Sequence, residues 1–170
     1  MKLICIGRNW LSSARASLLM ESHAPPSYEC PFCRLLRGAE TEHNRLADIV
    51  WQDERTTAFI SPRWWPKNHG HVLVIPNEHV ENLYAIDDNL LGAVYATAKR
   101  IAIGLKTAYG CEGTSTRQHN EPAGNQDVWH LHVHVFPRYP GDRLYQRHEE
   151  KRWASPEERA PYAAKLRAVL

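Results

Sequence analysis

Three histidines at alternate positions, His130, His132 and His134, constrain this chain more than any other feature of its sequence. The residues between them, Leu131 and Val133, are apolar. A period of two residues with apolar, partly β-branched spacers predicts a strand. Residues i, i+2 and i+4 of a strand point to one face, so the three imidazoles should project together, roughly 6–7 Å apart. Titratable rings on one face indicate metal binding, anion binding or chemistry.

The composition is ordinary for a soluble globular protein. The chain has 170 residues, enough for one domain with a sizeable core. Charged residues make up 24% of it, and the net charge of +2 is too small to indicate nucleic-acid binding. It contains no run of about 18 apolar residues, so we expect no transmembrane helix and no membrane partner.

The N-terminal segment resembles a leader peptide only weakly. The first 20 residues contain basic residues and several serines but no acid, which is typical of a transit or signal segment. Their apolar stretches are broken at Gly7, Arg8 and Asn9, which argues against secretion. We therefore expect residues 1–27 to be a disordered extension, or translation to begin at Met20, and the protein to be cytoplasmic.

The remaining pattern mixes short strands with helices. Strands are predicted at residues 49–53, 56–60, 71–75, 113–119 and around the three histidines. Helices are predicted at residues 30–37, 78–86, 88–109 and 156–169, the last from a capping box at Ser155 and Glu158. Short strands suited to antiparallel pairing predict an α+β fold. We expect one domain at residues 28–140, followed by a polar tail and C-terminal helix at residues 141–170.

Two segments together resemble the histidine-triad (HIT) family. One is Gly-His-Val-Leu-Val-Ile-Pro-Asn-Glu-His at residues 70–79, and the other is His-Leu-His-Val-His-Val-Phe-Pro-Arg at residues 130–138. The second matches the family signature His-φ-His-φ-His-φ-φ, where φ is apolar, at every position. The resemblance implies a HIT-like fold with a five-stranded antiparallel sheet, one long helix and several short helices, usually as a homodimer.

The resemblance also implies a reaction. Family members include nucleotidyl hydrolases and transferases that act at the α-phosphate of a nucleoside phosphoramidate or a (di)nucleoside polyphosphate. By motif position, His132 would be the nucleophile and would form a covalent nucleotidyl-histidine. A neutral imidazole is a good nucleophile near pH 7 and needs no base to activate it.

The developing negative charge of phosphoryl transfer requires donors around the phosphate. We expect His134 and His71 to supply them, since His71 lies on a strand that would neighbour the histidine strand. Gln126 would offer an amide N–H to the leaving-group oxygen. Asn120 would touch ribose or phosphate, although a simple turn asparagine explains it equally well.

Cys30 and Cys33 have the C-x₂-C spacing of half a tetrahedral zinc site. One branch of the HIT family joins such a pair to two histidines, and the resemblance implies a structural zinc ion held by Cys30, Cys33, His79 and His130. A pair of free thiols or a redox pair is the alternative, although the βαβ context of a redox motif is missing.

The chain departs from the family near the expected substrate. Ser61 stands where many members have an Asp or Asn that binds the ribose, and a serine makes fewer hydrogen bonds than a carboxylate accepts. The loop at residues 62–69 is longer than usual and holds Trp64 and Trp65, which either stack on a base or sugar or pack within the protein or against a partner subunit. Asn125 replaces a family glycine. We therefore expect an altered substrate choice.

Two other functions fit the sequence. The three histidines of the triad could bind one catalytic zinc ion, since His-x-His on a strand is a known zinc-binding arrangement. The protein could also be a catalytically idle nucleotide-binding adaptor. Retention of all three histidines argues against the adaptor.

Overall fold

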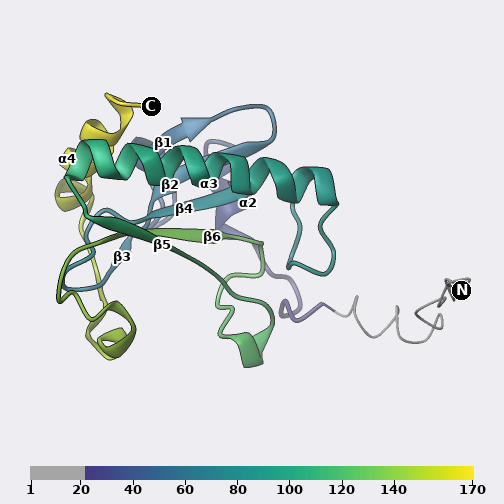
Figure 1. The fold of residues 1–170 in the computed structure, drawn as a ribbon. Helices are drawn as coiled ribbons and strands as arrows, with labels where there is room; N and C mark the ends of the chain where they lie inside the picture. The colour runs from purple at the N-terminus through teal and green to yellow at the C-terminus, as the bar shows by residue number, and fades with distance from the viewer. Residues whose placement is uncertain (1–21) are drawn as a thin grey trace, which may run out of the picture.

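The computed structural model describes residues 22–170 (Figure 1). Most of the predicted disordered extension therefore lies outside the described residues, and the domain boundaries at residues 27 and 140 remain predictions. Within the described part, no helix is both long and apolar enough to cross a membrane.

Five antiparallel strands form the main sheet, in the order β1-β2-β4-β6-β5. Their bounds are Ile49–Gln52 (β1), Thr56–Ile60 (β2), Val72–Pro76 (β4), Gly113–Gln118 (β5) and Val133–Arg138 (β6). The predicted α+β fold with a five-stranded antiparallel sheet is confirmed. The ladder of β6 begins at Val133, so only His134 lies within the strand, whereas His130 lies in a bend before it and His132 directly precedes it.

The long helix α3 (Asp88–Tyr109) covers one face of this sheet (Figure 1). The side chain of Asp87 accepts hydrogen bonds from the first amides of α3, and Gly110 ends the helix at a φ of 63°. Its apolar stripe packs against the inward valines of β4 and β6. The shared core contains Val72, Val74, Val94, Ala98, Ile101, Leu105, Val133 and Val135.

The opposite face of the sheet carries the histidines and the short helix α2 (Pro31–Leu36). Phe32 and Leu35 of α2 are buried against Phe59, Leu73 and Ile75 of the sheet. This second, smaller core holds α2 beside His130 and His132.

The helix predicted at residues 78–86 is wrong, because this segment consists of turns. Asparagine side chains take the backbone amides that a helix would use. Oδ1 of Asn82 accepts from the amide of Tyr84, and Oδ1 of Asn120 accepts from the amide of Leu83. Such local capture competes with helix formation.

The predicted loop at residues 61–70 contains a short strand that pairs with the tail. β3 (Arg63–Trp64) lies antiparallel to β7 (Arg152–Trp153). Trp64 is only 2% exposed, its indole N–H donates to the Ser61 carbonyl at 2.7 Å, and its ring contacts the rings of His69 and Tyr162. Trp64 therefore packs within its own chain.

Short 3₁₀ turns connect the remaining elements. They are η1 (Leu46–Asp48), η2 (Pro122–Gly124), η3 (Leu144–Gln146) and η4 (His148–Glu150). The tail ends in α4 (Pro156–Arg167), and Ser155 and Glu158 form the capping box that the sequence predicts. Ala163 and Leu166 of α4 are buried in the same core as α3.

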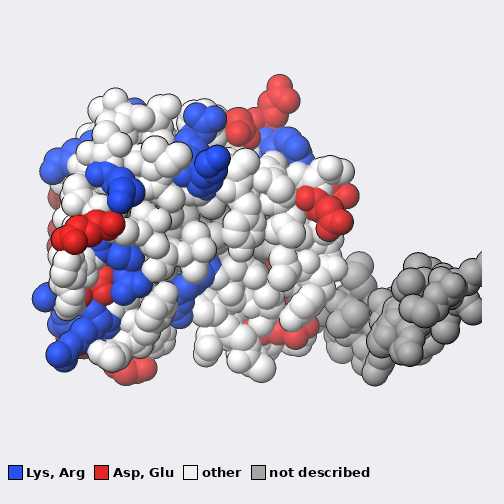
Figure 2. Space-filling model, viewed as in Figure 1, with Lys and Arg blue, Asp and Glu red and all other residues white. Residues whose placement is uncertain are grey.

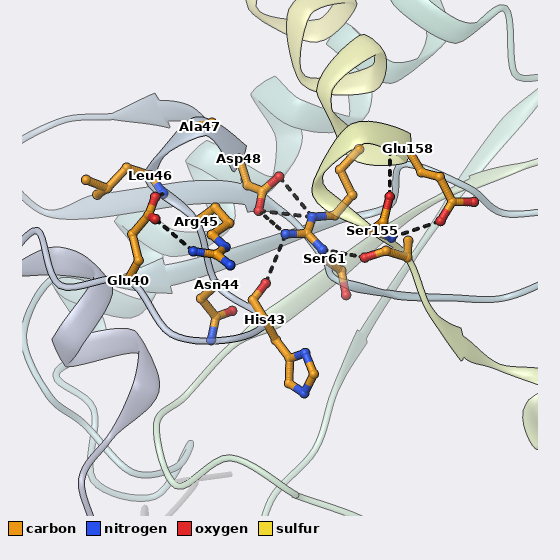
Figure 3. Close-up of polar contacts among 12 residues, drawn as sticks. Glu40, His43, Asn44, Arg45, Leu46, Ala47, Asp48, Ser61, Ser155 and Glu158 are labelled. Carbon is orange, nitrogen blue, oxygen red and sulfur yellow. Dashed lines mark hydrogen bonds and ion pairs between the residues drawn. The ribbon is translucent and has the colours of Figure 1, made fainter.

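A buried ion pair fastens α4 to the segment before β1 (Figure 3). Nε of Arg159 donates to both carboxylate oxygens of Asp48 at 3.0 Å. The same guanidinium donates to the carbonyls of Ala154 and His43. Arg159 is 1% exposed and Asp48 is 3% exposed, so this contact has almost no access to water.

Candidate functional site

Two cysteines and two histidines converge on the face of the sheet that carries α2. Cys30 caps α2 and Cys33 lies one turn later, while His79 follows β4 and His130 precedes β6. Their ligand atoms all lie within 4.8 Å of one another. Within residues 22–170 this is the single group of at least three His, Cys, Asp or Glu residues close enough to hold a metal ion, and it contains the four residues that the sequence proposes.

The orientation of His130 suits a zinc ligand. Its Nε2 donates to the carbonyl of Pro76 at 3.0 Å, so its Nδ1 keeps the lone pair and faces Sγ of Cys30 at 3.4 Å and Sγ of Cys33 at 3.6 Å. Sγ of Cys33 lies 3.2 Å from Nδ1 of His79. Ligand atoms around a tetrahedral zinc ion lie about 3.3–3.8 Å apart, and a carbonyl commonly holds the second nitrogen of a zinc-bound histidine. The donor set fits Zn²⁺.

His132 has one fixed and one free ring nitrogen. Its Nδ1 lies 2.8 Å from the carbonyl of His130. Because a carbonyl only accepts, Nδ1 carries the proton and Nε2 keeps its lone pair. The edge of Phe32 packs against the ring, and burial lowers the pKa of His132. The imidazole is therefore neutral at pH 7, the form that a nucleophile requires.

His134 and His71 face each other at the β4–β6 pair. Nδ1 of His134 lies 3.4 Å from Nε2 of His71, and their rings are stacked. His71 is fully buried, which lowers its pKa to about 3, and its Nδ1 has no hydrogen-bond partner within the described residues. A buried acceptor without a hydrogen-bond partner costs less than a buried N–H without one, so Nδ1 of His71 should carry no proton. His71 therefore donates from Nε2, and Nε2 of His134 holds a proton that it can donate.

An apolar pocket of about 330 Å³ opens beside these histidines. Phe32, Leu73 and Val128 line it with apolar surface, and His132 and His134 line it as well. Ser61 also lines it, as the sequence proposes for a substrate contact. Further lining residues are Pro31, Thr41, Glu42, His43, Asn44, Pro62, Arg63, Asp127 and Trp153.

A second, basic pocket of about 270 Å³ lies on the other side of His134. Its lining residues are Trp65, Arg117, His119, Asn125, Asp127, His134, Phe136, Tyr145, His148 and Lys151. His134 and Asp127 line both pockets. A ligand that passes His134 therefore has room on both sides.

Gln126 and Asn120, which the sequence places at the substrate, line neither pocket. Both amide hydrogens of Gln126 are used, since its Nε2 donates to the carbonyls of Glu81 and Val128 at 2.6 and 3.0 Å. Oδ1 of Asn120 accepts from the amide of Leu83 at 2.8 Å. In this conformation both side chains hold the loop before β6 to the turns after β4, and neither reaches the histidines.

Several pocket residues are not among the residues proposed from the sequence. Asp127 directly follows Gln126 and precedes the triad, which was the one signal available for it. Trp153 stacks on His43 with ring centroids 3.7 Å apart at the edge of the apolar pocket. Lys151 comes from the polar tail, where no sequence pattern marks it.

Known proteins are similar to this chain in sequence. The family model of the HIT domain matches residues 42–141. An uncharacterized HIT-like protein of Methanocaldococcus jannaschii is 32% identical over 114 residues, which are 66% of this chain and 81% of that protein. An adenylylsulfatase of Arabidopsis thaliana is 26% identical over 117 residues, which are 69% of this chain and 56% of that protein.

Solved structures share the fold. A zinc-bound histidine triad family protein from Mycobacterium smegmatis superimposes with a TM-score of 0.69 and 27% identity, covering 83% of this chain and 92% of that one. A hypothetical histidine triad nucleotide-binding protein from Sulfolobus tokodaii gives a TM-score of 0.67 and 26% identity, covering 82% and 91%.

Proposed function

The chain belongs to the HIT family, and we propose that it is a nucleotidyl hydrolase or transferase that cleaves the α-phosphate bond of a nucleoside phosphoramidate or (di)nucleoside polyphosphate. The observation that carries this proposal is His132, whose Nδ1–H is held by a carbonyl while its neutral Nε2 keeps a lone pair beside a pocket. The similar nucleotide-binding protein and the similar adenylylsulfatase support a nucleotide substrate.

The proposed reaction has two steps. Nε2 of His132 attacks the α-phosphorus and forms a P–N bond, while the bond from phosphorus to the leaving group breaks and its electron pair stays on the leaving atom. Nε2–H of His134, oriented by His71, donates to the oxygens that gain charge or to the leaving atom. Water or a second acceptor then attacks phosphorus and releases His132.

The apolar pocket suits the nucleoside. Its wall of Phe32, Leu73 and Val128 offers apolar surface to a base, and Ser61 is the polar side chain that we propose for the ribose. Gln126 and Asn120 would act indirectly, because their hydrogen bonds shape the loop that leads to His132.

The chemistry is tested by mass spectrometry of the intact protein. Wild type mixed with adenosine phosphoramidate or a dinucleoside polyphosphate and quenched rapidly should gain one nucleoside monophosphate. His132→Ala should gain nothing and should lose turnover by a factor of about 10³ or more. His23→Ala, a change at an exposed histidine, serves as the matched control and should behave as wild type.

Equal turnover by wild type and His132→Ala would contradict the proposed mechanism. Tight nucleotide binding by the wild type without any turnover would instead favour the idle adaptor.

We also propose that Cys30, Cys33, His79 and His130 hold a structural zinc ion, which would tie α2 to the sheet. All four positions would be filled by protein, so the ion would supply stability and no open coordination position. The zinc-bound relative supports this assignment. Nδ1 of His130 faces the sulfurs of Cys30 and Cys33. Because this nitrogen is directed at the cysteines, His130 is not placed to share one zinc ion with His132 and His134.

Metal analysis of purified variants tests the zinc site. Cys33→Ser should lose zinc, whereas Cys111→Ser, a matched change at a buried cysteine elsewhere, should keep one equivalent. His132→Ala should also keep it. Loss of zinc from His132→Ala with retention in Cys33→Ser would favour a zinc ion on the triad.

The remaining partner assignments are proposals as well. We propose a cytoplasmic homodimer that binds neither nucleic acid nor membrane. Light scattering of the full chain tests the dimer, and a monomer at micromolar concentration would contradict it.

A further inference from the structure

The basic pocket is built largely by residues that the proposed chemistry does not use. Its lining residues come from β5, from β6, from the segment after β3, from the loop between β5 and β6, and from the tail between β6 and α4. Tyr145, His148 and Lys151 lie beyond residues 42–141, the segment that matches the HIT domain. The tail therefore contributes three of the ten residues that line this pocket.

Positive charge in the basic pocket exceeds negative charge. Arg117 and Lys151 face one carboxylate, Asp127, among the lining residues. Nζ of Lys151 donates to Nε2 of His148 at 2.8 Å, a neutral partner, and burial lowers the pKa of Lys151. Lys151 is partly buried and forms no ion pair with a carboxylate within residues 22–170, and such a cation favours a bound anion.

Aromatic rings surround these cations. The guanidinium of Arg117 lies 5.7–6.0 Å from the ring centroids of Trp65, Phe136 and Tyr145. Nζ of Lys151 lies 5.8 Å from the ring of Trp65. The indole N–H of Trp65 is buried and has no hydrogen-bond partner within residues 22–170. Because Trp65 lines the pocket, the pocket brings a residue with an unused donor together with two cations.

The pocket meets the proposed reaction at His134, which lines both pockets. With the nucleoside in the apolar pocket and the α-phosphate at His132, a leaving group that continues past His134 would enter the basic pocket. Figure 2 shows Lys and Arg side chains over much of the left half of the drawn face, with Asp and Glu among them. The cations that line the basic pocket itself are Arg117 and Lys151.

We propose that the basic pocket binds the leaving group, and that this group is a polyphosphate chain, free or carrying a second nucleoside, rather than an amine. This inference rests on the proposed function. The bond that breaks is the one from the α-phosphorus to the bridging oxygen, whose electron pair stays on the departing phosphate as His132 forms its bond to phosphorus. Arg117 and Lys151 then hold the charge of the departing phosphate, and Tyr145 offers a ring for a second base to stack on.

The test compares two substrates in the full-length protein. We expect Lys151→Met to lower kcat/KM for diadenosine tetraphosphate about 10–100-fold more than kcat/KM for adenosine phosphoramidate. Lys151→Arg should restore most of the preference, and Lys99→Met, a matched change at an exposed lysine on α3, should leave both values unchanged. An equal loss on both substrates, or no loss on either, would overturn the proposal.

A binding measurement separates failure of this inference from failure of the proposed function. Calorimetric titration with inorganic tripolyphosphate needs no turnover. Wild type should bind it, and Lys151→Met should bind at least tenfold more weakly at the same salt concentration. If the wild type turns over neither substrate but this difference holds, the pocket is an anion site and the proposed reaction is wrong. Equal binding by both proteins refutes the pocket.

Discussion

Replacing Arg159 with methionine tests how the C-terminal helix is held on the sheet. Methionine retains an apolar stem but removes the guanidinium that contacts Asp48 and the carbonyls of Ala154 and His43. Breaking a buried ion pair by removing one partner costs about 3–5 kcal/mol, because the remaining charge is left unpaired. For a chain of this size, we expect the Tm to fall by about 6–20 °C.

The pH dependence of this loss makes the prediction sharper. Burial already raises the pKa of Asp48 in the presence of Arg159, and without Arg159 the folded protein should hold this carboxyl protonated at pH 7. Protonation removes the unpaired buried charge, and it therefore limits the loss of stability. Protonating a carboxyl of ordinary pKa at pH 7 requires about 4 kcal/mol, so the loss should not exceed about that value. The folded variant then binds a proton that the unfolded chain releases, so its stability falls as the pH rises above about 4.

The assay is urea unfolding of wild type and Arg159→Met at pH 5 and pH 7. The deficit of the variant should be smaller at pH 5 than at pH 7, by at most about 2.7 kcal/mol, which is the effect of one proton over two pH units. The double variant Asp48→Asn with Arg159→Met should lose this pH dependence. Lys165→Met, which changes an exposed lysine of the same helix, should move the Tm by no more than about 2 °C. A deficit under about 1 kcal/mol, or one that is equal at the two pH values, refutes the reasoning.

Three further predictions concern the site face and its support. Burial lowers the pKa of His71 to about 3, so stability is lost as pH falls below about 6.5, and His71→Gln should flatten the slope of unfolding free energy by about 1.4 kcal/mol per pH unit between about pH 5.5 and 4. Gly70 has a φ of 71° and its Cβ would collide with the ring of Tyr162, so Gly70→Ala should cost about 2 kcal/mol or more in urea unfolding. Trp64→Ala should cost about 3–5 kcal/mol in the same assay, and a cost near zero would contradict its buried position.

Local signals explain which elements the sequence predicts well. The bounds of α3 agree with prediction because Asp87 caps its start and Gly110 adopts the left-handed conformation at its end. The strand Thr56–Ile60 also agrees, since β-favouring residues are concentrated there and turn residues flank them. The spacing of Cys30 and Cys33 indicates only half a metal site. His79 and His130 reach the two cysteines only through the folding of the sheet, and the sequence indicated them only through the family resemblance.

Contacts between distant segments explain what the sequence does not predict. β3 and β7 are two residues each, too short for a periodic pattern, and they pair across the whole sheet domain. The segment at residues 78–86 has a helical pattern, but Asn120, far along the chain, takes one of its amides. Lys151 reaches the basic pocket only because the tail folds back past β6. No pattern in the sequence near these residues predicts these contacts.

Because β3 pairs with β7, the segment that matches the HIT domain is shorter than the segment that packs as one unit. A fragment cut at residue 141, where the matched HIT segment ends, would leave β3 without its partner strand and Asp48 without Arg159. It would also uncover Trp64, whose ring rests against Tyr162 of α4. An exposed indole beside an unpaired strand edge favours aggregation. Grafting this tail onto another HIT domain would therefore require transfer of the tryptophan loop as well, because each is the other's packing surface.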